Sequence, residues 1–108
     1  MEKKLYREEL TQMEINAHRA SLNGEPAVYC GTYGKYNNGD ISGMWVDVAS
    51  FTDYEEFMEF CERVHADEED VEFMFQDYEG FPYAWYSESG MGEEIFDKIK
   101  DFAKLDRK

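Results

Sequence analysis

With 108 residues and a hydrophobic content of 43%, the chain has the size and composition of one small globular domain rather than of a two-domain enzyme. Its 25 acidic residues outnumber 11 Lys and Arg, and the formal net charge of −14 repels nucleic acid and anionic lipid. No uncharged run approaches the roughly 20 apolar residues of a membrane span, and charges fill the place of a secretory leader's apolar stretch, so we expect a cytoplasmic protein.

The first predicted element is a helix over residues 3–21, where apolar side chains recur at spacings of three and four. Two strands follow, over residues 27–33 and 41–48, because small, β-branched and aromatic residues dominate the first and side chains alternate in the second. The pair Asn38-Gly39 lies between them, and both residue types can adopt the positive φ that a tight turn requires. These features together predict a β-hairpin.

A second helix is predicted over about 53–65, because its apolar residues fall on one face of a helical period. Thr52 and Glu55 have the spacing of a capping box, which marks the start of the helix. Glu55, Glu59 and Glu62 then project from the opposite, solvated face, at intervals of about 6 and 4.5 Å along the axis. The sequence therefore predicts a row of fixed carboxylates on a rigid scaffold.

A third strand is predicted over 71–78, after an acidic loop. Strict alternation in that strand places Asp77 on the face of Phe75 and Tyr78 on the other face. A last helix is predicted within 90–108. The sum is an α+β fold: a small antiparallel β-sheet of about three strands, packed with helices and flanked by N-terminal and C-terminal helices.

The acidic residues are concentrated in one quarter of the chain. Residues 53–79 hold 12 acidic residues and a single basic one, Arg63, whereas residues 1–22 are balanced in charge. Aromatic residues alternate with the acids, which distinguishes this stretch from a disordered acidic tail. Two interpretations remain open: a solvated surface that keeps the protein soluble, or a surface that binds a basic partner. The twelve acidic residues are Asp53, Glu55, Glu56, Glu59, Glu62, Asp67, Glu68, Glu69, Asp70, Glu72, Asp77 and Glu79.

Catalysis and metal binding by these carboxylates are disfavoured. A hydrolase would need two carboxyl groups whose environments separate their pKa values, whereas these groups occupy solvated positions. Residues 67–70 lack the alternating ligands and the glycine of a calcium loop. Cys30 and Cys61 are expected as thiols, and Cys30 with His65 fits a core thiol and a surface histidine better than a nucleophile and its base. We therefore expect no enzyme, no cofactor and no bound metal.

Four segments, in this order, resemble the N-terminal part of the ArdA antirestriction proteins: 26–39 (PAVYCGTYGKYNNG), 43–47 (GMWVD), 53–57 (DYEEF) and 75–82 (FQDYEGFP). The resemblance covers residues 26 to about 89 closely and the final helix loosely. Proteins of that family are carried by plasmids, conjugative transposons and phages. They inhibit type I restriction–modification enzymes by occupying the DNA-binding groove as acidic mimics of duplex DNA, without a cofactor or catalysis.

The resemblance divides the chain into an N-terminal helical extension at 1–25, an ArdA-like α+β domain at 26–89, and a helix at 90–108 that starts a second helical domain or caps the first. The family's dimerisation domain has no counterpart in these 108 residues, so self-association is left open. Position by position, the resemblance assigns five residues to the DNA-mimicking surface: Asp53, Glu55, Glu56, Asp77 and Glu79. The other seven of the twelve acidic residues are assigned to this surface because they lie in the same acidic stretch, 53–79.

With this resemblance, the sequence predicts a non-enzymatic inhibitor whose partner is a type I restriction–modification enzyme. We expect it to bind neither nucleic acid nor a membrane. The alternative is an acidic module that binds another basic DNA-binding or regulatory protein. Duplex DNA carries one charge per about 1.7 Å, so the 11 excess charges of residues 53–79 replace about 19 Å of duplex. We expect this chain to inhibit more weakly than an intact, dimeric member of the family.

Overall fold

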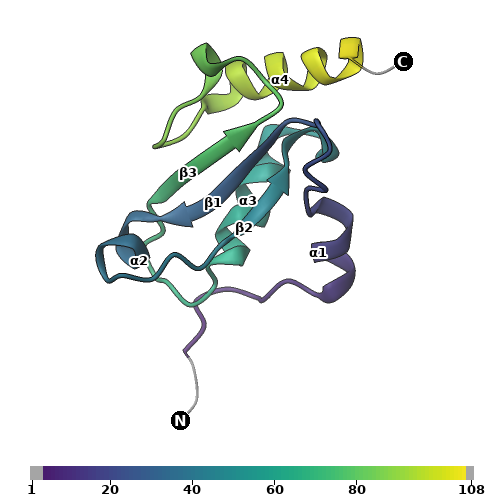
Figure 1. The fold of residues 1–108 in the computed structure, drawn as a ribbon. Coiled ribbons are helices and arrows are strands. Elements are labelled where there is room, and N and C mark those ends of the chain that lie inside the picture. The colour runs from purple at the N-terminus through teal and green to yellow at the C-terminus, as the bar shows by residue number, and fades with distance from the viewer. Residues whose placement is uncertain (1–3, 107–108) are drawn as a thin grey trace.

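The structure is a computed structural model that describes residues 4–106, so the first three and last two residues of the chain lie outside the described part (Figure 1). Its elements are α1 (Gln12–His18), β1 (Ala27–Thr32), α2 (Tyr33–Asn37), β2 (Met44–Asp47), the 3-10 helix η1 (Val48–Ser50), α3 (Tyr54–Val64), β3 (Phe73–Glu79), the 3-10 helix η2 (Tyr83–Trp85) and α4 (Gly92–Asp106). The strands form one antiparallel sheet in the order β2-β1-β3. Helix α3 lies behind one face of this sheet and α4 crosses one end, which confirms the predicted α+β class (Figure 1). None of the helices in residues 4–106 is long and apolar enough to cross a membrane.

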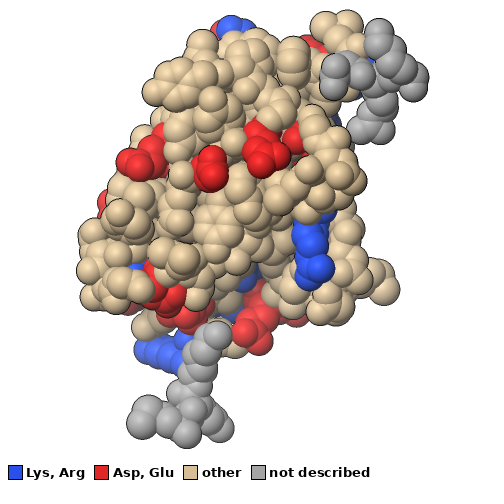
Figure 2. Space-filling view, viewed as in Figure 1, with Lys and Arg blue, Asp and Glu red and all other residues tan. Residues whose placement is uncertain are grey.

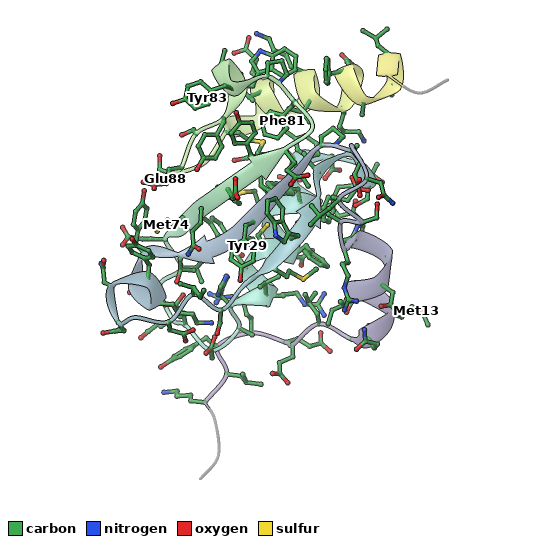
Figure 3. The ribbon with its side chains drawn as sticks, viewed as in Figure 1. Met13, Tyr29, Met74, Phe81, Tyr83 and Glu88 are labelled. Atoms are coloured by element: carbon green, nitrogen blue, oxygen red, sulfur yellow. The ribbon has the colours of Figure 1, made fainter. Side chains whose placement is uncertain are left out.

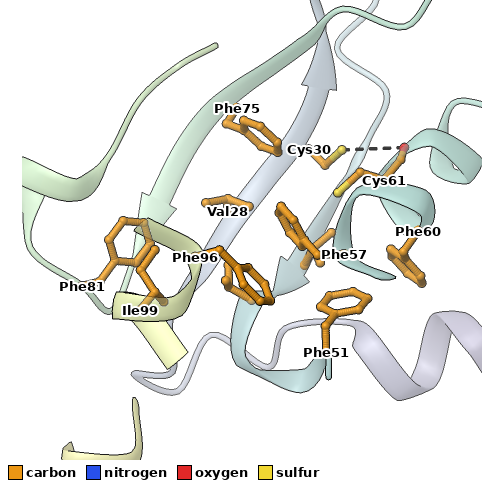
Figure 4. Close-up of a cluster of buried hydrophobic side chains, with 12 residues drawn as sticks. Val28, Cys30, Phe51, Phe57, Phe60, Cys61, Phe75, Phe81, Phe96 and Ile99 are labelled. Atoms are coloured by element: carbon orange, nitrogen blue, oxygen red, sulfur yellow. Dashed lines mark hydrogen bonds between the residues drawn. The ribbon is translucent and has the colours of Figure 1, made fainter. Parts of the chain in front are cut away.

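The core lies between the sheet and the two longer helices, α3 and α4 (Figure 4). Phe57 of α3 is fully buried at its centre. The centroid of its ring lies 6.1 Å from that of Phe75 on β3 and 5.5 Å from that of Phe96 on α4. Burying a phenylalanine side chain contributes about 1.5–3 kcal/mol. A single side chain of α3 therefore ties this helix to both the sheet and α4.

Helix α3 begins and ends within one residue of the predicted span, but its cap is shifted. Asp53 is the N-cap, and its Oδ1 accepts a hydrogen bond from Glu56 N at 2.8 Å. Glu56 Oε1 in turn accepts one from Thr52 N at 2.7 Å. The predicted capping box of Thr52 and Glu55 is therefore wrong, because Asp53 already satisfies an N–H group of the first turn. Glu55 is left to project into solvent.

The predicted helix over 3–21 is wrong in extent, because only α1 is helical in the described part of this span. Thr11 caps α1, with its Oγ1 accepting from Glu14 N at 3.1 Å and its N–H donating to Glu14 Oε1 at 2.9 Å. Before this cap, the carbonyl of Glu8 accepts a hydrogen bond from Arg63 of α3 at 3.0 Å. Bonds to a residue 55 positions away replace helical ones here, and sequence periodicity does not contain them.

Strands β1 and β2 pair in antiparallel fashion as predicted, but the tight turn between them is wrong. The connection contains α2, whose N-cap Thr32 accepts a hydrogen bond from Lys35 N at 3.1 Å. Asn38 ends α2, and Gly39 follows with a φ of 76°. The Asn-Gly pair thus ends a helix, since a left-handed glycine serves a helix terminus as well as a hairpin.

Strand β3 pairs with β1 through a β-bulge, which changes the faces predicted for its side chains. Val28 of β1 lies opposite Tyr78. Two positions further along β1, Cys30 lies opposite Phe75, three positions from Tyr78. The extra residue reverses the alternation beyond it. Tyr78 therefore packs against the core and Asp77 turns to the outer face of the sheet, the reverse of the predicted placement.

Candidate functional site

The solvated face of α3 carries a row of three exposed carboxylates, Glu55, Glu59 and Glu62. At about 100° per residue they fall within about 60° of one another, on the side of α3 opposite the buried Phe57 and Cys61. None of the three forms a salt bridge with any residue that the structure describes. The predicted row is therefore present, with its charges uncompensated by direct pairing.

Two further predicted residues, Asp53 and Glu56, lie at the N-terminal end of α3 and are exposed. Their carboxylates accept backbone hydrogen bonds of the cap at 2.8 and 2.7 Å. Such bonds fix the side chains without removing their charge, and the positive end of the helix dipole favours carboxylates there. Asp53 and Glu56 thus add negative charge at fixed positions around the first turn of α3, next to Glu55.

Asp67, in the loop after α3, is paired. Its Oδ1 lies 2.9 Å from Lys35 Nζ, and the side chain of Lys35 is only 13% exposed. The same Nζ lies 3.0 Å from His65 Nδ1, and His65 Nε2 lies 3.0 Å from the carbonyl oxygen of Cys30. Because an ammonium group only donates, Nδ1 accepts and Nε2 donates its proton to the carbonyl, as in a neutral imidazole. Lys35 therefore compensates the charge of Asp67 on this surface.

His65 is fully buried, so the predicted surface histidine is wrong. Both of its ring nitrogens have partners, on Lys35 and Cys30, and this removes the cost of burying an unpaired polar group. Cys30 is a buried free thiol as predicted, and Cys61 is one too (Figure 4). Burial raises the pKa of the Cys61 thiol. The three side chains thus belong to the core.

Replacing Lys35 by Met is expected to lower the free energy of unfolding by about 1–3 kcal/mol, because Asp67 and His65 each lose a hydrogen-bond partner in a partly buried site. Urea denaturation followed by circular dichroism measures the change. The control is Lys98→Met, which removes the same charge from an exposed position on α4 and should stay within about 0.5 kcal/mol of the wild type. Equal effects of the two substitutions would contradict the role of Lys35.

The remainder of the loop is held by the N-terminal segment, residues 4–18. Arg7 of this segment donates hydrogen bonds to the carbonyl oxygens of Glu68 and Glu69 at 2.7 and 3.3 Å. Glu69 and Asp70 are exposed, whereas Glu68 is half-buried. The loop therefore presents the two solvated carboxylates of Glu69 and Asp70 on a backbone that Arg7 holds by hydrogen bonds. The guanidinium of Arg7 lies close to this loop.

Strand β3 places its predicted residues elsewhere. Asp77 and Glu79 are exposed on the outer face of the sheet, away from α3, and Glu72 is exposed just before the strand. Figure 2 shows this outer face, where acidic side chains stand in separate groups on a largely uncharged surface. The twelve predicted residues thus do not form one patch, because the row on α3 and the pair on β3 face opposite sides of the sheet.

Two acidic residues that the charge count passed over lie beside α3. One hollow in the surface has Glu14, Glu59 and Arg63 among its lining residues. A second is lined in part by Glu8 and Glu62, again with Arg63. Residues 1–22 taken together are balanced in charge, so a concentration of acidic residues does not mark Glu8 and Glu14. The capping-box spacing of Thr11 and Glu14 is the sequence signal that could have identified Glu14 as a fixed acidic side chain, and the helix predicted over 3–21 ran through it.

A cavity of about 380 Å³ lies between the N-terminal segment, α3 and the start of β2, and Leu10, Ile15, Met44 and Val64 supply its apolar lining. Nowhere in residues 4–106 do three or more His, Cys, Asp or Glu side chains form a group that could hold a metal ion.

Comparison with known proteins identifies the family. A family model described as antirestriction protein (ArdA) matches residues 28–108, which is most of the chain. No curated protein and no solved structure matches. The matched part contains the sheet except for the first residue of β1, together with α3, α4 and all twelve predicted carboxylates, and it leaves out the N-terminal segment with α1. The chain therefore belongs to the ArdA family of antirestriction proteins.

Proposed function

We propose that this chain inhibits a type I restriction–modification enzyme by placing the acidic face of α3 in the groove that binds DNA. The family is one of protein inhibitors rather than enzymes. The observation that carries the proposal is the row of Glu55, Glu59 and Glu62, which are exposed, unpaired among the described residues and fixed on one side of a helix. A rigid row of anions meets a groove built for phosphates without the ordering cost of a flexible tail.

The spacing of the row supports this comparison with DNA. The three carboxylates extend over about 10.5 Å of helix axis, with a mean interval of about 5 Å. Measured along the axis of duplex DNA, one strand carries a phosphate every ~3.4 Å. The row therefore imitates one strand at a reduced density of charge. Asp53 and Glu56 at the start of α3, and Glu69 and Asp70 in the loop that follows the helix, are exposed and add further negative charge.

Competition with DNA tests the proposal. A labelled duplex bound to a purified type I enzyme should be displaced by the chain, and the chain and duplex should exclude each other. The affinity should fall with salt, with a slope of log affinity against log salt of about −3 if three carboxylates replace phosphates. A complex that holds chain and duplex together would contradict occupation of the groove.

Charge reversal on the outer face of the sheet distinguishes whether the acidic face of α3 or that of β3 enters the groove. The double substitution Asp77→Lys and Glu79→Lys is expected to change inhibition less than about threefold, because these side chains point away from α3 and act only through long-range, screened attraction. Inhibition of DNA cleavage, assayed at physiological salt, measures the change. A loss of tenfold or more would show that the sheet face, rather than α3, enters the groove.

A further inference from the structure

Arg63 is the single basic residue of the acidic stretch 53–79, and the N-terminal segment holds it firmly. Its two terminal nitrogens donate to the two carboxylate oxygens of Glu14, each at 2.8 Å. Its Nε donates to the carbonyl oxygen of Glu8 at 3.0 Å, and one terminal nitrogen also reaches that of Glu9 at 3.1 Å. Four hydrogen bonds thus use four of the five N–H donors of the guanidinium.

Because Arg63 lies next to the acidic row on α3, its hydrogen bonds to the N-terminal segment affect the charge of that row. Glu59 precedes Arg63 by four positions, and side chains at that spacing are neighbours on a helix surface. An arginine without another partner would pair with Glu59 and cancel one of the three charges of the row. In the structure Glu14, rather than Glu59, is the partner of Arg63. The side chain of Glu14 is 39% exposed and that of Arg63 is 18% exposed.

We propose that Glu14 is a positioning residue for the acidic face of α3: it engages Arg63, and so keeps Glu59 available to a basic partner. This inference rests on the proposed function, and it assigns a role to a segment that lies outside the part matched by the family. The hydrogen bond from Arg63 lowers the pKa of Glu14 to about 2. The pair therefore persists through the neutral range. Its contribution to stability is present above pH 4.5 and is lost as the pH falls towards 2.

The N-terminal segment has other anchors, so removing one charge at Glu14 should leave it in place. The imidazole of His18 stacks on the ring of Phe51 with centroids 4.0 Å apart. The chain after α1 pairs with β2, where Ala20 N donates to Trp45 O at 3.2 Å. The effect of Glu14 on binding can therefore be separated from unfolding of the segment.

The test compares Glu14→Gln, Arg63→Gln and the double variant in the competition assay with duplex DNA. Glu14→Gln releases the cation beside Glu59 and should weaken binding about fivefold. Arg63→Gln removes the cation and should bind as tightly as the wild type or more tightly. The double variant should recover wild-type binding. A merely structural role predicts instead that both single variants weaken binding and that the double variant does not recover.

The matched control is Asp97→Asn, which makes the same change of net charge at an exposed position on α4 and should alter binding less than twofold. A folded Glu14→Gln variant that binds like the wild type overturns the inference. Titration of the Glu14 carboxyl by NMR gives a readout that needs no enzyme: an ordinary pKa in the wild type also overturns it. Failure of the wild-type chain to displace DNA overturns the proposed function, while the titration still decides the pairing.

Discussion

Reversing Glu55, Glu59 and Glu62 to lysine is expected to reduce inhibition of a type I enzyme by about 100-fold or more. Each substitution turns an attraction into a repulsion on the face that we place in the groove, at a cost of at least about 1 kcal/mol per site. The fold should persist, because the three side chains are exposed and unpaired among the described residues and lysine is a good helix former. Inhibition of DNA cleavage and circular dichroism measure the two effects.

A matched triple reversal on α4 controls for net charge. Glu94, Asp97 and Asp101 are exposed at comparable helical spacings, and their change to lysine adds the same six units of charge. Long-range attraction is screened within about 8 Å at physiological salt, so this control should lose less than tenfold. A folded α3 variant that inhibits like the wild type, or like the α4 control, would show that α3 is not the contact surface.

The acidic row could be predicted from the sequence because the evidence for it is local. Phe57 and Cys61 recur with a helical period, and this alone fixes which side of α3 is buried. Glu55, Glu59 and Glu62 then occupy the opposite side whatever the helix packs against. The composition of the sheet, with turn residues between short runs of β-branched and aromatic residues, is local evidence of the same kind.

The features that the sequence did not reveal depend on partners far away in the chain. The N-terminal segment leaves the helical conformation before Thr11 because Arg63 binds its backbone. His65 is buried because Lys35 and the Cys30 carbonyl, 30 and 35 positions away, satisfy its ring. The bulge in β3 turns Asp77 outwards, and no periodic pattern contains an inserted residue. In each case a tertiary contact decides where a side chain lies, and the bulge in addition keeps Asp77 off the face that carries the row on α3.

Phe57→Ala is expected to lower the free energy of unfolding by about 3–5 kcal/mol, a large part of the roughly 5–15 kcal/mol that stabilises a small domain. The side chain is fully buried, and its ring packs against Phe51, Phe75 and Phe96, which come from three other parts of the fold. Its removal leaves a cavity where α3 meets both β3 and α4. Urea denaturation measures the loss.

Met13 projects from α1 into solvent and supplies the control (Figure 3), since Met13→Ala should change stability by less than about 0.5 kcal/mol. Phe57→Leu should fall between, because leucine refills part of the cavity. The acidic row itself is untouched by these changes, so any folded fraction of Phe57→Ala should keep the salt dependence of wild-type binding. A loss of inhibition larger than the unfolded fraction would mean that the core also sets the angle at which α3 presents its carboxylates. A Phe57→Ala protein as stable as Met13→Ala would contradict the packing that places α3 on the sheet.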